Sequence, residues 1–181
     1  MSLNIVEELA PTNPDAEIWW DSSPLIYPSW KEETLAKAPA GKLADWREQL
    51  TRLYDNATIH ESGTMGFRGV TTNPPLSLQA IKLAPELWTA EIKKIARENP
   101  GMDVEQVYWA MYLDLVKKGA SAIRRVWDTS AGKYGFLSGQ VDPRFVTDGE
   151  KRPAQGLTIA AQGANVMVKL PGSKEGYEVL E

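Results

Sequence analysis

The side chain most suited to covalent chemistry is Lys169, near the end of the apolar run 165–170. In a strand, Val166 and Val168 would face one side, and Met167 and Lys169 the other. Lysine is rarely buried without a purpose, and withdrawal from water favours its neutral amine, which can form a Schiff base with a carbonyl. The competing interpretation is a strand-end lysine that extends into solvent, and it is the commoner one for such a strand taken alone. The run therefore makes Lys169 a candidate nucleophile.

Polar side chains also end the other apolar runs of the chain. Asp21 follows the run 18–20, and Asn73 and Gln140 end the two β-rich runs that come next. The carboxyl ends of parallel strands meet at one edge of a sheet, where α/β folds place their sites. A carboxylate there can shuttle protons, and amides can hold a water or a substrate hydroxyl. The competing interpretations are a cap or turn residue for Asp21, turn chemistry for Asn73, and an ordinary polar strand end for Gln140.

Four short β-rich runs, each followed by helical sequence, must position these side chains. The strands are predicted near 17–21, 66–72, 134–141 and 164–170. Helices are predicted at 41–57, at 77–98, from a cap at Asp103 to about Val126, at 149–162 and from Lys174 to Glu181, and residues 22–28 are predicted to form a Pro-rich loop. Strands that alternate with helices indicate an α/β fold with a parallel sheet. The pattern fits a small open sheet or the first half of a (β/α)8 barrel, whose typical length is about 250 residues.

Composition excludes several classes of function. The chain has 181 residues, a net charge of −4, one histidine and no cysteine. Disulfide and thiol chemistry are therefore excluded, and so is a His/Cys metal cluster. Scattered Lys and Arg residues form no basic stripe for nucleic acid, and no apolar run approaches the roughly 20 residues of a membrane helix. Residues 1–10 do not resemble a signal peptide, so we expect a cytoplasmic protein that binds neither nucleic acid nor membrane, with His60 at its surface.

Four segments, in order along the chain, resemble the strand motifs of one enzyme family. Ile18–Asp21 is similar to the first strand of transaldolases, Gly69–Pro74 to the second and Gly135–Arg144 to the third. Asn165–Gly176 resembles the fourth-strand segment around their Schiff-base lysine. The resemblance extends over nearly the whole chain, and fructose-6-phosphate aldolases are similar as well. It implies that residues 1–181 are a single partial domain, the N-terminal half of a TIM (β/α)8 barrel with about four strands.

The resemblance also implies a role for each candidate residue. Lys169 would attack the C2 carbonyl of a ketose, and Asp21 would shuttle protons at the sugar hydroxyls. Asn73, Thr71 and Ser138 would contact the dihydroxyacetone unit. The resulting iminium is an electron sink that lets the C3–C4 bond break, after which the three-carbon unit passes to an aldose acceptor. The implied partners are ketose and aldose phosphates, and no metal or organic cofactor is implied.

Two departures from the family pattern shape this expectation. Gln140 stands where transaldolases usually carry a glutamate that activates water, and an amide can orient water but cannot take its proton. Fructose-6-phosphate aldolases share this glutamine, so release of free dihydroxyacetone is the alternative to its transfer.

The second departure is length. The remaining strands, with the family's phosphate-binding arginine and serine, are expected beyond Glu181. This predicts a truncated chain that is marginally stable, self-associates through its open barrel edge or aggregates. A non-catalytic sugar-phosphate-binding fragment is therefore the third alternative.

Overall fold

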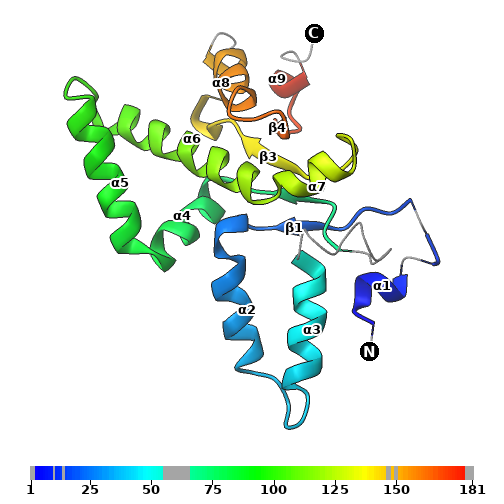
Figure 1. Ribbon diagram of the computed structural model, residues 1–181. Coiled ribbons are helices and arrows are strands. Elements are labelled where there is room, and N and C mark those ends of the chain that lie inside the picture. The colour runs from blue at the N-terminus through cyan, green and yellow to red at the C-terminus, as the bar shows by residue number, and fades with distance from the viewer. Residues whose placement is uncertain are drawn as a thin grey trace.

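A sheet of four parallel strands lies at the centre of the fold (Figure 1). The computed structural model describes residues 3–9, 11–13, 15–54, 66–145, 148 and 151–177. The strands are β1 (Trp19–Asp21), β2 (Gly69–Thr71), β3 (Phe136–Gln140) and β4 (Val166–Lys169). Each pairs in parallel with its neighbour in sequence, in the order β1-β2-β3-β4. The four predicted strands and their parallel arrangement are confirmed.

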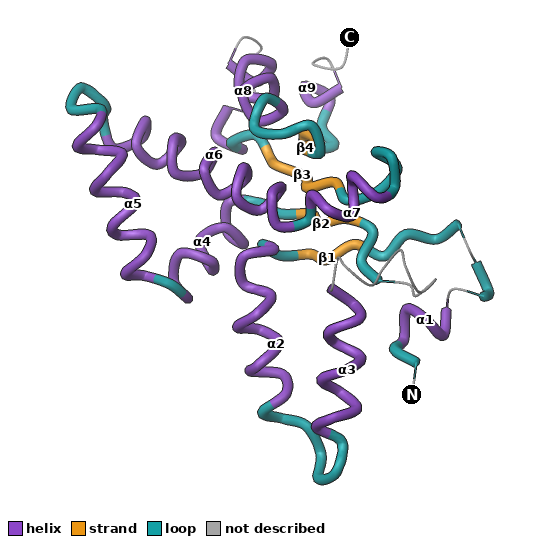
Figure 2. The backbone as a smooth tube through the Cα atoms, viewed as in Figure 1, coloured by secondary structure: helices purple, strands orange, loops and turns teal. Residues whose placement is uncertain are grey.

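Helices occupy most of the connections between the strands (Figure 2). They are α1 (Ile5–Leu9), α2 (Tyr27–Leu35), α3 (Leu43–Tyr54), α4 (Pro74–Leu83), α5 (Pro85–Glu98), α6 (Val104–Ala122), α7 (Arg124–Thr129), α8 (Lys151–Ala160) and α9 (Lys174–Tyr177). Two short 3-10 turns, Pro24–Ile26 and Pro143–Phe145, follow β1 and β3. In the part of the chain that the structure describes, no helix is long and apolar enough to cross a membrane.

Proline accounts for two differences from the predicted helices. The helix predicted at 77–98 is in fact two, α4 and α5, which are separated at Ala84. Proline disfavours helical geometry in the residue before it, and Ala84, which precedes Pro85, has φ −133° and ψ 60°. The predicted loop at 22–28 is wrong as well, because it holds a 3-10 turn and the start of α2. Pro28 occupies the first turn of α2, where its missing N–H costs no hydrogen bond.

The long helix predicted from Asp103 is also interrupted. It starts as predicted, with Asp103 as the N-cap of α6, but its regular geometry stops at Ile123, where φ is −109° and ψ is 7°. The bend allows the backbone of Val126 and Trp127 in α7 to lie directly against Gly135, at the start of β3. Close packing of α7 on the sheet therefore explains why the helix does not continue straight.

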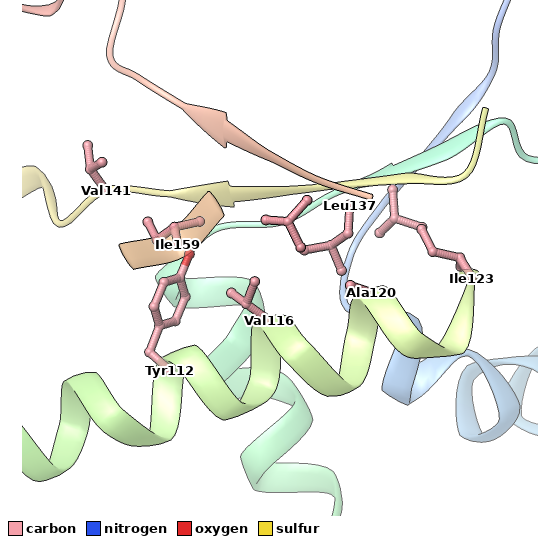
Figure 3. Close-up of a cluster of buried hydrophobic side chains, with 9 residues drawn as sticks. Tyr112, Val116, Ala120, Ile123, Leu137, Val141 and Ile159 are labelled. Carbon is pink, nitrogen blue, oxygen red and sulfur yellow. The ribbon is translucent and has the colours of Figure 1, made fainter. Parts of the chain in front are cut away.

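The main hydrophobic core lies between one face of the sheet and the helices α6 and α8 (Figure 3). Val70, Leu137 and Val166 supply the sheet side, and Val116 and Ile159 supply the helix side. Each such buried aliphatic side chain contributes about 1.5–3 kcal/mol relative to an exposed one. Because successive strand residues alternate between faces, this core directs the neighbouring residues of each strand to the opposite, open face.

Candidate active site at the sheet edge

Two rows of side chains at the carboxyl edge of the sheet form the candidate site. Strand pairing places Asp21, Thr71 and Ser138 side by side on β1, β2 and β3. Gln140 and Lys169 are partners further along, on β3 and β4. Side chains two residues apart on a strand share a face, so all five lie on the open face of the sheet. The sheet therefore brings together on one face residues that are far apart in the sequence.

Lys169 reaches across the sheet to the second strand. Val166 is buried in the core and Met167 is 37% exposed on the other face, which confirms the predicted alternation in β4. Lys169 is half-buried, and its Nζ donates a hydrogen bond to Thr71 Oγ1 at 3.3 Å. Since β3 lies between β2 and β4, the lysine side chain crosses over β3 on the open face. Its amine is thus held at the sheet edge.

Asp21 ends β1 with an exposed carboxylate in the row of Thr71 and Ser138. The following 3-10 turn is capped by Ser23, whose Oγ accepts a hydrogen bond from the Leu25 N–H at 3.4 Å. The competing interpretation of Asp21 as the cap of this turn therefore does not hold.

Asn73 has a capping role of its own. Its Oδ1 accepts a hydrogen bond from the Leu76 N–H at 2.9 Å, which makes it the N-cap of α4. This satisfies one of the backbone donors that every helix start leaves open. Since the oxygen is engaged in the cap, a substrate contact from Asn73 would come from its Nδ2.

Ser138 and Gln140 lie on β3, between the lysine and the other strands. Ser138 is buried, and Gln140 is half-buried beside its partner Lys169. The backbone of Gln140 is bonded to Tyr112 on α6, a residue that the sequence did not indicate. Tyr112 Oη accepts from the Gln140 N–H at 2.8 Å and donates to the Gln140 carbonyl at 3.0 Å. A tyrosine in the apolar stripe of a helix gives no sign in the sequence that its hydroxyl meets a strand end.

The row nearer the amino ends of the strands is apolar. Trp19, Gly69 and Phe136 are partners there, on the same open face. The indole of Trp19 lies so close to Gly69 that a Cβ at this position would be 2.7 Å from Trp19 Cδ2. Only glycine therefore lets the indole lie over β2. The polar rows are bordered on one side by an apolar layer, as in the layered interior of a barrel.

An ion-paired loop follows β3. The Arg144 guanidinium donates from Nε to the Asp142 carboxylate at 2.9 Å and holds the pKa of that carboxyl below its usual range. Arg144 Nη2 also lies 3.0 Å from Glu105 Oε1 at the start of α6. These contacts attach the loop after Gln140 to α6.

Neither a metal site nor a histidine is found among the residues that the structure describes. Among the residues that the structure describes, no three Asp, Glu or His side chains are grouped so that they could hold a metal ion. The predicted surface position of His60 lies outside the described residues.

Comparison with known proteins gives one consistent result. Residues 53–181 match the family model described as Transaldolase/Fructose-6-phosphate aldolase. A transaldolase of Thiobacillus denitrificans is 29% identical over 140 residues, which cover 75% of this chain and 38% of the relative. Transaldolase 1 of Streptomyces coelicolor is 32% identical over 159 residues, covering 81% and 41%. A transaldolase of Mycobacterium leprae is 28% identical over 150 residues, covering 81% and 39%.

The extent of the family match corrects the expectation that the resemblance covers nearly the whole chain. The family match lies in the C-terminal part of the chain and not over its N-terminal part, so β1 and Asp21 fall outside it. The chain spans about two fifths of the length of the curated relatives it matches. The match and the four parallel β/α units together support a partial TIM barrel.

Proposed function

Because this chain belongs to the transaldolase/fructose-6-phosphate aldolase family, whose matching relatives are transaldolases, we propose that its sheet edge performs Schiff-base chemistry on a ketose phosphate. The observation that carries the proposal is the position of Lys169. Its Nζ lies 3.3 Å from Thr71 Oγ1, on the open face and at the carboxyl edge of the sheet. A lysine in such a place can meet a carbonyl substrate at the edge where barrel enzymes bind theirs.

The proposed reaction begins when the neutral amine of Lys169 adds to the C2 carbonyl of the ketose. Loss of water gives an iminium, which withdraws electrons from C3. Asp21 takes the proton of the C4 hydroxyl, the C3–C4 bond breaks, and its electron pair enters the iminium to form an enamine. The aldose leaves with a new carbonyl at the former C4. The enamine then attacks the aldehyde of an acceptor, Asp21 returns the proton, and hydrolysis frees Lys169.

The remaining candidates hold the three-carbon unit. Thr71 accepts a hydrogen bond from Lys169 and thereby orients the amine. Ser138, in the row between Thr71 and Met167, presents a hydroxyl to the substrate. Asn73 offers its Nδ2, because its Oδ1 caps α4. These polar groups fix the orientation of a sugar that the apolar layer of Trp19 and Phe136 limits from the other side.

Gln140 favours a second outcome for the same intermediate. Gln140 is the strand partner of Lys169, and its amide can orient a water molecule, although it cannot take a proton from that water. If the enamine is protonated and the iminium then hydrolysed, dihydroxyacetone is released and the reaction is that of an aldolase. Product analysis separates the two reactions, because transfer consumes an aldose acceptor and yields a new ketose, whereas cleavage yields free dihydroxyacetone.

Borohydride trapping tests the covalent step. The purified chain is incubated with dihydroxyacetone or fructose 6-phosphate, reduced, and searched for adducts by peptide mass. We expect a three-carbon or sugar adduct on Lys169 that is absent from Lys169→Ala. Lys174→Ala is the matched control, since Lys174 is an exposed lysine five residues further along, and it should retain the adduct.

Other outcomes of trapping have definite meanings. A folded chain that binds fructose 6-phosphate without any adduct would favour a non-catalytic sugar-phosphate-binding role. An adduct that survives Lys169→Ala would contradict the assignment of the nucleophile.

Self-association through the open sheet is the last part of the proposal. Trp19, Phe136 and Met167 are apolar side chains of the open face, and β1 and β4 are edge strands of the described sheet. Unpaired parallel edges and exposed apolar surface both promote association.

A further inference from the structure

Gln140, the last residue of β3, lies beyond the point where its neighbour β2 has ended. The Val141 N–H donates to the Lys169 carbonyl on the β4 side at 3.3 Å. On the β2 side, the Ser138 carbonyl accepts from the Thr72 N–H at 3.2 Å. Gln140, two residues after Ser138, therefore directs its own N–H and carbonyl toward the β2 side. β2 ends at Thr71, and its chain leaves the sheet at Asn73 to form α4.

The hydroxyl of Tyr112 bonds the backbone of Gln140 on the side where β2 no longer extends. It lies 2.8 Å from the nitrogen and 3.0 Å from the carbonyl oxygen of Gln140, so one side-chain oxygen satisfies both backbone groups. Figure 3 shows the ring rising from α6 with its oxygen toward β3. Buried backbone groups without a partner are costly, and this contact completes the hydrogen bonding of the strand end.

The position of Tyr112 is well fixed. The residue is 1% exposed, and its ring lies 5.4 Å from that of Trp109. Burial raises the pKa of Tyr112 to about 12, while its bond to the Gln140 backbone acts in the opposite direction. The phenol therefore keeps its proton at neutral pH, and a neutral hydroxyl can donate and accept at the same time. The contact with the Gln140 backbone therefore requires no change in the protonation of Tyr112 near neutral pH.

We propose that Tyr112 is a positioning residue, whose hydroxyl anchors the end of β3 and thereby holds the Gln140 side chain beside Lys169. The inference rests on the proposed function of this sheet edge. Side chains alternate between faces along a strand, so a strand end that twists loose would carry the Gln140 amide away from the lysine. Tyr112 belongs to the core on the other face of the sheet from Lys169, and we expect it to act on the site through Gln140.

The consequence is a selective defect in Tyr112→Phe. The ring stays in the core, and Lys169 keeps its contact with Thr71, so trapping of dihydroxyacetone on Lys169 should remain as in the wild type. Release of dihydroxyacetone from fructose 6-phosphate depends on the water that Gln140 orients. We expect its kcat to fall about tenfold with KM changed less than twofold, because an interaction made in the later step affects kcat and not ground-state binding.

The experiment compares four variants of the 181-residue chain. Tyr112→Phe is tested beside Tyr108→Phe, a tyrosine one turn earlier on α6 whose loss should leave kcat unchanged. Gln140→Ala and the double variant Gln140→Ala/Tyr112→Phe complete a cycle. Because Tyr112 acts only through Gln140, the double variant should be no slower than Gln140→Ala. Amide hydrogen exchange by NMR should show faster exchange at Gln140 in Tyr112→Phe, with Gly139 unchanged.

Each outcome separates this inference from the proposed function. A wild-type chain without a Lys169 adduct would end the proposed function, and the inference with it. With the adduct present, a Tyr112→Phe variant that turns over as fast as the wild type would overturn the inference alone. A variant that loses adduct and turnover in equal measure would also overturn it, since Tyr112 would then be a general structural residue.

Discussion

Gly135 determines how β3 begins. Its φ is +81°, a conformation in which a side chain is strained, and a Cβ there would lie 2.3 Å from the Trp127 nitrogen. Its N–H donates to the Arg68 carbonyl at 2.7 Å. The residue therefore allows close contact between α7 and the sheet, with the backbone already bonded.

Gly135→Ala should lower the free energy of unfolding by about 2–5 kcal/mol, because left-handed strain and overpacking both act at this position. Urea unfolding followed by tryptophan fluorescence measures it. Gly41→Ala is the matched control, since Gly41 has a φ of +78° but nothing within 4 Å of its Cβ position, and only strain of about 1–2 kcal/mol should remain. Equal losses for the two variants would show that contact with α7 contributes nothing.

Single residues of the site differ in how far the sequence reveals them. The alternation along the strand was enough to place Lys169 on the face opposite Val166, and the structure shows that Val166 faces the core. The role of Asn73 as a cap was missed, because turn chemistry was predicted there and the helix was predicted to start only at residue 77, although asparagine before proline is a frequent helix start. Tyr112 was not predictable. Its link to Gln140 joins residues 28 positions apart and depends on where β2 stops, which no local pattern records.

At the scale of elements, Asn165 connects three of them. It is 1% exposed, and its Nδ2 donates to the Ala120 carbonyl in α6 and to the Gly135 carbonyl before β3, at 2.9 Å each. Its own backbone carbonyl accepts from the Leu137 N–H at 2.9 Å. The start of β4 is thus attached to the end of α6 and to the neighbouring strand by one side chain and its backbone.

Asn165→Ala should lower the free energy of unfolding by about 2–4 kcal/mol, because two buried carbonyls lose their donor. Chemical denaturation at constant pH gives the value. In the control Asn99→Ala, an exposed amide that donates to the Ile95 carbonyl at 3.0 Å is removed, and the change should stay within about 0.5 kcal/mol. A similar small change for Asn165 would mean that water can replace its two bonds.

The elements themselves were predicted unevenly. Strands and amphipathic helices such as α3 follow from the hydrophobic period, and the N-terminal boundary of α6 follows from the cap predicted at Asp103. Proline was the source of error, because it can either end a helix or begin one. Pro85 divides the helix predicted at 77–98, and Pro28 lies in the first turn of a helix that starts within the loop predicted at 22–28.

At the scale of the whole molecule, the open face of the sheet carries apolar side chains that favour self-association. Met167 is 37% exposed there, in the row of Ser138, although a methionine in a strand usually packs. Met167→Glu should shift sedimentation toward smaller species, because a charge on the face opposes its burial against a partner. Leu157→Glu makes the same change on α8, where Leu157 is already 74% exposed, and should leave the distribution unaltered. Equal effects of the two variants would indicate nonspecific association driven by net charge.

The strand order has a consequence for synthesis. In the described sheet, each strand pairs with the strands next to it in sequence, so the sheet can grow from β1 toward β4 as the chain emerges from the ribosome. The 64 residues from Thr72 to Gly135 separate β2 from β3, and translating them takes roughly 3–13 s. Helices form within about a microsecond, so α4 to α7 have ample time to form before β3 appears. β3 would then pack against the apolar face of α6 as soon as it is translated.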